Sequence, residues 1–426
     1  MKPMLAVCAF ALLLLVDLRR SPAADPALPQ LKVALFGYVP DADAAAARLQ
    51  EAFAAQKTGY TLCVTPLDPY HDKDTVGSIP TLQHFADFDV VETDLCRLED
   101  LRDGKIGLET LPKEWTWYPT PAAASGSAKA IVSSLDFKKY AVPHWICQNF
   151  VIRWTGSPPT PGAGPVQGLD AGPGRPVLGD FWGTTGLGEF YAGALANKCG
   201  PVNAENSLRA LAAKAAKLPP DVTITVADLD RPASDAVLTL AAKLPGPFRS
   251  HLSYYHSHPE LYAWEFASNR KAVFIGYSES LFYTQLSGDA SNPASPHRPI
   301  GPADVSIKPL NFCAKGAQGT PSWTDGFVIP KGKLAGKKLV IEQFIKFATT
   351  PTAYACFEQP EAGLAAANLL PAYEAVYTDP GTIRDEPLLR EFHDRFDASF
   401  VIDHSQVWRG MKQAGSALED ALQPSN

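Results

Sequence analysis

Apolar and polar residues follow two different periods along the first hundred residues. Residues 31–38 (LKVALFGY) form an apolar run typical of a buried strand, and 42–56 space apolar residues as an amphipathic helix does. Further strands are expected at 60–66 and 88–93. This alternation predicts a parallel sheet covered by helices, with ligand-binding loops at the carboxyl ends of the strands. Those ends carry Tyr38, Asp41, Asp68, Tyr70 and Asp94.

A second alternation begins after residues 156–174, a stretch rich in Pro and Gly that we interpret as a surface loop or linker. Just before it, residues 140–154 (YAVPHWICQNFVIRW) predict a proline-marked loop that runs into an apolar strand. The later part of the chain predicts strands at 177–186, 222–227, 273–276, 304–309 and 325–329, and helices at 208–217, 233–243, 338–347, 351–357, 388–396 and 406–422.

This order of elements resembles the two-lobed, type II periplasmic solute-binding fold. That α/β fold has a mostly parallel sheet flanked by helices in each lobe and a ligand cleft between the lobes. We expect lobe 1 to comprise residues 30–152 plus about 304–345, and lobe 2 to comprise 153–303 plus part of 346–426. The length of 426 residues fits two lobes, because single cores stop growing at about 250–300 residues.

Residues 1–24 have the three parts of a secretory signal peptide: a basic Lys2, an apolar run at 5–16, and small residues at 21–24. The apolar run is too short to span a bilayer, which needs about 20 residues. Residues 5–8 (LAVC) resemble a lipid-attachment box, but that box should follow the apolar run rather than begin it. We therefore expect cleavage near Ala23 or Ala24 and a secreted or periplasmic protein without a membrane segment.

Charge and cysteine content narrow the function further. The net charge of -7 argues against a nucleic-acid partner, which calls for a basic patch. No cysteine pair has a metal-binding spacing, so a structural zinc site is not expected. An even number of cysteines after cleavage is compatible with full pairing, whereas a catalytic thiol would leave at least one other unpaired. These six are Cys63, Cys96, Cys147, Cys199, Cys313 and Cys356.

The segment 273–285 (VFIGYSESLFYTQ) predicts a strand that ends in polar residues where a helix begins. Its Gly276-x-Ser278-x-Ser280 pattern approaches a serine nucleophile elbow, but it lacks the final glycine. A serine hydrolase would also need a later acid and histidine, such as Asp325 with His393 or His404. In the alternative interpretation, Glu279 is the working residue, either as an acid/base or only as a favourable charge at a helix start.

Cys147 is the second candidate for chemistry. Its sequence neighbours are mostly apolar, as around an inert buried cysteine, but the Gln148–Asn149 pair interrupts the run and suggests a strand edge at a cleft. A nucleophilic thiol needs partial exposure and a nearby base. His144 lies three residues away, so an extended strand would place it on the opposite face.

Two more motifs are candidate ligand-binding sites. His256 and His258 form an HxH pair that would need at least one further ligand to hold zinc. Trp323 and Asp325 would share one strand face in the segment 323–329 (WTDGFVI), where a ring beside a carboxylate suits a flat cation. An Asx turn before Gly326 is the structural alternative.

Taken together, four segments resemble the thiamine pyridinylase (base-exchange thiaminase) family, which is built on the two-lobed solute-binding fold. They are LKVALFGYVPD, YAVPHWICQNFVIRW, KAVFIGYSES and SWTDGFVI. The resemblance implies that Cys147 is the nucleophile and Glu279 its acid/base. It further implies substrate contacts from Tyr38, Tyr70, Asp94, Tyr277, Trp323 and Asp325, where Trp323 stands in place of a tyrosine of the family.

The implied reaction is a transfer: the cysteine adds to the pyrimidine of thiamine, the thiazole leaves, and a second nucleophile takes the pyrimidinylmethyl group. No metal or organic cofactor is required, and we expect a monomer whose partners are thiamine and this nucleophilic co-substrate. The principal alternative is a non-catalytic binding protein for thiamine or a related pyrimidine. A binding protein would share the aromatic residues and aspartates, but it would not need Cys147 and Glu279.

Overall fold

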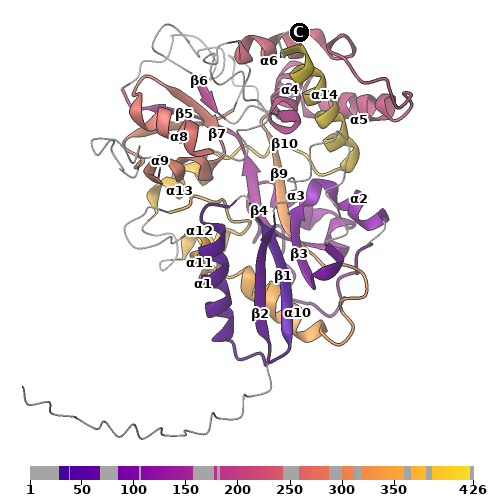
Figure 1. Ribbon diagram of the computed structural model, residues 1–426, viewed down its shortest axis with the longest axis vertical. Coiled ribbons are helices and arrows are strands. Elements are labelled where there is room, and N and C mark those ends of the chain that lie inside the picture. Colours follow the sequence, from indigo (N-terminus) through magenta and orange to yellow (C-terminus); the bar gives the residue numbers. More distant parts are fainter. Residues whose placement is uncertain are drawn as a thin grey trace, which may run out of the picture.

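The computed structural model describes residues 28–37, 39–67, 85–104, 107–156, 177–179, 183–242, 259–286, 300–310, 312, 319–358, 366–379 and 386–422. They form two lobes, each with its own sheet and a surround of helices, and β4 and β9 run toward the border between the lobes (Figure 1). The two-lobed α/β architecture expected from the element order is therefore present.

The first lobe contains a mixed six-stranded sheet. Five of its strands lie in the order β10-β9-β3-β1-β2, and the sixth, β4, also pairs with β9. The β1 strand is parallel to β2 and β3, as the sequence predicted, whereas β9 is antiparallel to β3 and β4. The bounds are β1 (Gln30–Phe36), β2 (Thr61–Leu67), β3 (Val90–Asp94), β4 (Ala141–Gln148), β9 (Pro321–Val328) and β10 (Phe400–Val401).

Helices cover this sheet with the apolar face that the sequence predicted for the first of them. The α1 helix buries Ala45, Ala46, Leu49 and Phe53, which recur at three- and four-residue spacings along one face. The Phe53 ring packs against Phe344 and Phe347 at centroid distances of 5.8 and 5.6 Å. The helices of this lobe are α1 (Ala42–Ala54), α2 (Leu98–Asp103), α3 (Ala128–Ser133), α10 (Lys338–Ala348), α11 (Pro351–Glu358) and α12 (Glu374–Thr378).

The second sheet has the order β6-β7-β5-β8, with bounds β5 (Phe150–Trp154), β6 (Val177–Gly179), β7 (Val273–Gly276) and β8 (Val305–Pro309). Its β5 strand is antiparallel to both neighbours, and only β6 and β7 are parallel, so a mostly parallel sheet was the wrong expectation here. The expected return to lobe 1 near residue 304 also falls too early, because β8 still pairs with β5. The chain reaches the first sheet again at β9.

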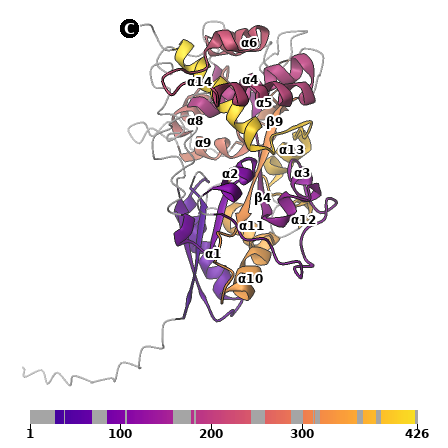
Figure 2. The same cartoon turned by 90° about the vertical axis from the view of Figure 1, so that its right-hand side faces the viewer.

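The helices of the second lobe are α4 (Gly183–Cys199), α5 (Pro201–Ala215), α6 (Arg231–Ala241), α8 (Pro259–Ser268), α9 (Tyr283–Leu286), α13 (Pro387–Arg395) and α14 (Ser405–Leu422). The C-terminal α14 helix packs on α4 and α5 (Figure 2). Glycines permit the close approach: a Cβ at Gly415 would lie 1.8 Å from the Thr184 carbonyl oxygen, and one at Gly188 would lie 2.3 Å from that of Met411. The sequence pattern did not predict α4 because most of its described residues are buried, which leaves no polar face.

Two local expectations were wrong for identifiable reasons. Residues 222–227 form no strand, because the Asp228 carboxylate accepts hydrogen bonds from the Thr225 amide and hydroxyl and closes a 3-10 turn at Val226–Asp228. Residues 140–154 form two strands, β4 and β5, in different sheets, with Asn149 at the crossing.

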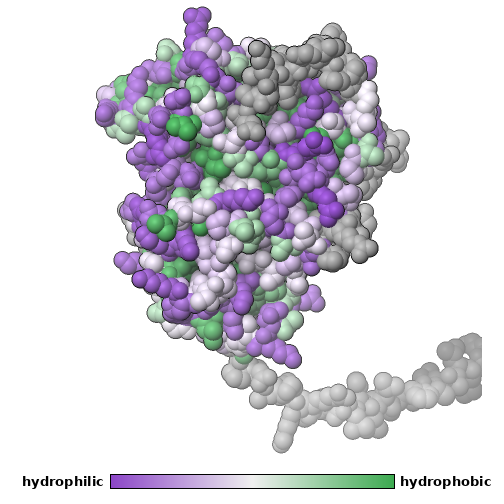
Figure 3. All heavy atoms as spheres, turned by 180° about the vertical axis from the view of Figure 1, so that it is seen from behind, coloured by the Kyte–Doolittle hydropathy of each residue, from purple (hydrophilic) through white to green (hydrophobic). Residues whose placement is uncertain are grey.

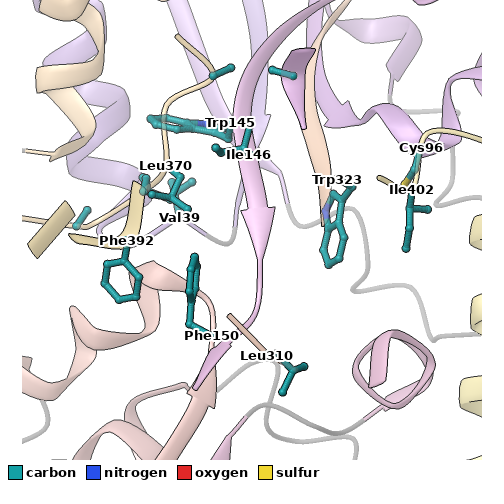
Figure 4. Close-up of a cluster of buried hydrophobic side chains, with 14 of the residues drawn as sticks. Val39, Cys96, Trp145, Ile146, Phe150, Leu310, Trp323, Leu370, Phe392 and Ile402 are labelled. Atoms are coloured by element: carbon teal, nitrogen blue, oxygen red, sulfur yellow. The ribbon is translucent and has the colours of Figure 1, made fainter. Parts of the chain in front are cut away.

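Buried apolar side chains continue from one lobe to the other. Figure 4 shows Trp145 and Ile146 of β4 beside Leu370, with Phe150 of β5 facing Phe392 at a ring distance of 4.9 Å. The start of β5 is therefore packed into the same core as the end of β4, which fixes the crossing between the lobes.

The surface mixes polar and apolar side chains. Figure 3 shows hydrophilic residues interspersed with small hydrophobic patches over one face. The exposed large apolar side chains of the described residues are dispersed along the chain: Leu28, Leu135, Val202, Val222 and Leu339. Among the described residues, no helix combines the length and apolarity needed to cross a membrane.

Candidate active site

A β-bulge in β4 arranges the polar side chains of the first sheet. Pro143 pairs with Gly326 and Trp145 with Asp325, so His144 is an extra residue on β4. The backbone carbonyls at the bulge are satisfied by tyrosine hydroxyls: Tyr373 donates to Pro143 at 2.7 Å and Tyr354 to His144 at 2.5 Å.

The bulge overturns the expectation that His144 and Cys147 lie on opposite faces. The His144 ring packs 4.5 Å from Phe327, and Cys147 hydrogen-bonds to Asp325, two residues from Phe327 on β9. Residues two apart on a strand share a face, so His144 and Cys147 lie on one side of the sheet. The buried His144 hydrogen-bonds through Nδ1 to Glu92 rather than to the thiol.

The Cys147 side chain is half-buried among carboxylates at the end of β4. It lies opposite Trp323 in the β4–β9 pairing, and its Sγ donates a hydrogen bond to Asp325 Oδ2 at 3.2 Å. Burial, followed by the charges of Asp325 and Glu279, raises the pKa of this thiol well above its usual value. The resting group is therefore a neutral thiol at neutral pH.

Asp94 and Asp325 form a buried acid pair on neighbouring strands. They are directly opposite in the antiparallel β3–β9 register, and each is about 5% exposed or less. Burial raises the pKa of Asp325 well above its usual value, and the charge and hydrogen bond of Asp94 raise it further. A hydrogen bond between two carboxyl groups needs a proton, and the raised pKa means that Asp325 keeps its proton to a higher pH than an exposed aspartate does.

Glu279 reaches the site from the other lobe. Gly276 at the end of β7 pairs with Phe150 at the start of β5, and the turn Tyr277–Glu279 follows directly. The carboxylate of Glu279 acts on Cys147 as a charge that raises the pKa of the thiol. The hydrogen bond from the thiol goes to Asp325, so the expected pairing of Cys147 with Glu279 is electrostatic in this structure.

Tyr277 and Trp323 meet beside the thiol, edge to face, with ring centroids 5.8 Å apart and an interplanar angle of 81°. Trp323 is buried and has a second edge contact with Trp408 at 6.0 Å. The Tyr277 hydroxyl donates to Glu189 Oε1 at 2.7 Å. Both rings therefore belong to one aromatic group at the border of the lobes, and their contact with a substrate stays a prediction.

The serine hydrolase arrangement is not assembled. The buried Ser278 hydroxyl donates to Glu279 Oε2 at 3.3 Å. His393 lies against Ser125 and Glu374, while His404 lies 3.4 Å from Glu99. Ser278 is a turn residue whose hydroxyl contacts the neighbouring carboxylate.

Several sequence predictions fall outside the described residues. These are the signal peptide at 1–24, most of the Pro/Gly-rich stretch, and the individual residues Tyr38, Asp68, Tyr70, His256, His258 and Cys313. Their placement stays a prediction. Within the described ranges, no group of three or more His, Cys, Asp or Glu side chains is arranged to hold a metal ion. All five described cysteines after the signal segment are free thiols, so full disulfide pairing was the wrong alternative.

Two acidic residues of the site were missed by sequence reasoning. Glu92 lies two residues before Asp94 in the strand FDVVETD, and that spacing alone would have placed both carboxylates on one face. Glu189 lies on α4, a helix that the sequence pattern did not predict.

Solved structures with the same fold include enzymes and binding proteins. Thiaminase I from Bacillus thiaminolyticus is 19% identical, with 92% of this chain and 100% of that chain covered and a TM-score of 0.64. Clostridium botulinum thiaminase I in complex with thiamin is 17% identical, with 92% and 100% covered and a TM-score of 0.67. Maltose-bound MalE3 from T. maritima is 15% identical, with 92% and 98% covered and a TM-score of 0.57.

These likenesses establish the two-lobed solute-binding fold. No protein-family model matches the chain, and a search of curated proteins finds no relative. The function therefore rests on the chemistry of the site.

Proposed function

We propose that the protein is a thiamine-cleaving transferase of the base-exchange type, with Cys147 as nucleophile and Glu279 as acid/base. The observation that carries the proposal is the Cys147 thiol at the border of the lobes, hydrogen-bonded to one acid of a buried pair and within the field of Glu279. The likeness to two thiaminase I structures over nearly the whole chain supports it.

The charge of the site favours a cationic substrate. Asp94, Asp325 and Glu279 surround one thiol, and the negative charge among them opposes thiolate formation. A bound thiazolium would offset that charge and lower the pKa of Cys147 when substrate is present. The thiolate would then form in the complex, and the free enzyme would keep an unreactive thiol.

The bonds of the reaction balance without another reagent. Glu279 takes the proton of Cys147 and the sulfur adds to the electron-poor pyrimidine ring. The bond from the methylene to the thiazolium nitrogen breaks, and its electron pair leaves with the neutral thiazole. A second nucleophile adds to the methylene: an amine such as aniline releases its proton to solvent, whereas pyridine has no proton to lose and its product keeps the positive charge. The sulfur then leaves the ring and recovers its proton from Glu279.

The acid pair suits the edge of an aminopyrimidine. One proton and one charge on Asp94 and Asp325 give one donor and one acceptor, which match a ring nitrogen and an exocyclic amine. We assign the flat walls of the site to Tyr277, Trp323 and, on the resemblance alone, Tyr38 and Tyr70. We propose a secreted or periplasmic location, because residues 1–24 have the features of a signal peptide.

One experiment separates the enzyme from a non-catalytic thiamine-binding protein. Purified protein is incubated with thiamine and either pyridine or aniline, and release of thiazole is followed by mass spectrometry for wild type, Cys147→Ser and Ser278→Ala. The proposal predicts turnover by wild type and Ser278→Ala and none by Cys147→Ser. Tight thiamine binding without turnover would establish the binding protein, and turnover that survives Cys147→Ser but not Ser278→Ala would revive the serine elbow.

A further inference from the structure

A buried carboxylate on α4 connects two parts of the site that come from distant segments. Glu189 is 1% exposed, and its oxygens accept hydrogen bonds from two side chains. The Tyr277 hydroxyl donates to Oε1 at 2.7 Å, and the Asn149 amide donates to Oε2. A carboxylate is costly to bury unless hydrogen-bond donors satisfy it, so the hydrogen bonds from Tyr277 and Asn149 stabilise Glu189 at this position.

The two donors occupy matching positions relative to the proposed catalytic residues. Asn149 lies two residues after Cys147, where the chain crosses from β4 to β5. Tyr277 lies two residues before Glu279, where β7 ends and the following turn begins. One oxygen of Glu189 therefore binds the segment that carries the proposed nucleophile, and the other oxygen binds the segment that carries the proposed acid/base.

The support beneath Glu189 is rigid. The preceding residue, Gly188, lies against α14 so closely that a Cβ would meet the Met411 carbonyl oxygen at 2.3 Å, which fixes the α4 backbone at this turn. On the other side, the Tyr277 ring contacts Trp323, the residue opposite Cys147 on β9. The links run from α4 through Tyr277 to the strand beside the thiol.

We propose that Glu189 is a positioning residue that sets the separation between Cys147 and Glu279 by holding Asn149 and Tyr277. The inference rests on the proposed function for the roles of Cys147 and Glu279. In this proposal Glu189 acts through its reach and through the hydrogen bonds that it accepts from Asn149 and Tyr277.

Length and charge of this side chain are tested separately by two substitutions. Glu189→Gln keeps the length and can still accept from Asn149, whereas Glu189→Asp keeps the charge but is one methylene too short for both donors. We expect kcat to fall about fivefold in Glu189→Gln and about 50-fold in Glu189→Asp, with KM within about threefold of wild type, since a shift near 1 Å can cost about 100-fold in rate.

The two hydrogen bonds that join Glu189 to Asn149 and Tyr277, which we call the tether, also predict how substitutions combine. Tyr277→Phe removes one arm of the tether, so the double variant with Glu189→Asp should be at most about twofold slower than Glu189→Asp alone. Glu205 on α5, a surface acid paired with Arg209, provides the matched controls Glu205→Gln and Glu205→Asp. Both controls should keep kcat and KM within about twofold of wild type.

A second measurement does not depend on turnover. The rate at which iodoacetamide alkylates Cys147, followed on the tryptic peptide, should rise about fivefold in Glu189→Asp and stay unchanged in both Glu205 variants, because releasing β4 from the tether exposes a half-buried thiol. If Glu189→Asp does not fold, as judged by circular dichroism, Asn149→Ala and Tyr277→Phe test the same rise from the donor side.

The results separate the two proposals. A wild-type protein that releases no thiazole would refute the proposed function. The alkylation rates would then still show whether Glu189 holds Cys147 in place. A Glu189→Asp variant with wild-type kcat and alkylation rate, or one less affected than Glu189→Gln, would show that the tether is absent or that charge rather than reach matters. Additive losses in the double variant would also overturn the inference.

Discussion

Neutralising the two acids beside Cys147 one at a time should move the pKa of its thiol in opposite directions. Asp325→Asn leaves the negative charge of the pair on Asp94, one strand farther from the sulfur, so the pKa of Cys147 should fall. Asp94→Asn removes the charge and the hydrogen bond that raise the pKa of Asp325, so Asp325, whose Oδ2 lies 3.2 Å from Sγ, ionises more readily and the pKa of Cys147 should rise.

The magnitude follows from Coulomb's law. With an effective dielectric constant of about 20, a unit charge ~4 Å from the thiolate disfavours it by about 4 kcal/mol, and one ~8 Å away by about 2 kcal/mol. For a wild-type charge shared equally between the two positions, each variant would change this energy by about half the difference, or ~1 kcal/mol. That energy is a shift of roughly 0.7 to 1 pKa unit in each direction.

The assay is the pH dependence of Cys147 alkylation by iodoacetamide, quantified on its own peptide so that the other thiols do not contribute. Asp235→Asn, a substitution of an exposed acid on α6, should leave the profile unchanged and serves as the control. Shifts of the same sign in Asp325→Asn and Asp94→Asn would refute the shared proton. No shift in either variant would remove the pair from the environment of the thiol.

Three further predictions concern stability and the thiols. Glu358 is fully buried, and burial raises its pKa well above the usual value, so Glu358 destabilises the folded protein as the pH rises above the pKa that it has in the unfolded chain. Glu358→Gln should therefore raise Tm by about 2 °C at pH 8 and not at pH 4. An equal gain at both pH values would contradict this. In a urea titration, Gly415→Ala should lower the free energy of unfolding by about 2 kcal/mol or more, because the new Cβ would meet the Thr184 carbonyl oxygen at 1.8 Å. The control Gly301→Ala, where the nearest atom is 3.6 Å away, should lower it by less than ~1 kcal/mol. Alkylation of unreduced, denatured protein should label Cys63, Cys96, Cys147, Cys199 and Cys356, and protection of Cys147 in a disulfide would exclude it as nucleophile.

The sequence patterns located the elements whose neighbours impose a simple period. The α1 helix and the first three strands were predicted within a few residues, because α1 has one buried face and the strands are short runs rich in apolar residues. The α4 helix could not be found in this way, since most of its described residues are buried and its Gly188 lies against Met411 of α14, more than two hundred residues later in the chain.

Candidate site residues could be named from the sequence where the pattern is local, whereas the contacts between them depend on strand register. Cys147, Asp325 and Asp94 were named from their segments, and the sheet brings them together. The face of His144 was wrong because a bulge adds one residue to β4, and no alternation rule anticipates it. The acceptor of the thiol hydrogen bond was also unpredictable, because it depends on the β4–β9 register, which brings Asp325 beside Cys147.

The central claim is that the Cys147 sulfur bonds covalently to the pyrimidine of thiamine. Its most direct test is to mix the protein with excess thiamine without an added nucleophile, quench in acid within seconds, and measure the intact mass and the Cys147 peptide. We expect a pyrimidinylmethyl adduct on Cys147, released thiazole in equal amount, and loss of the adduct when aniline is added before the quench. An unmodified Cys147 together with thiazole release, or an adduct that also forms in Cys147→Ser, would contradict it.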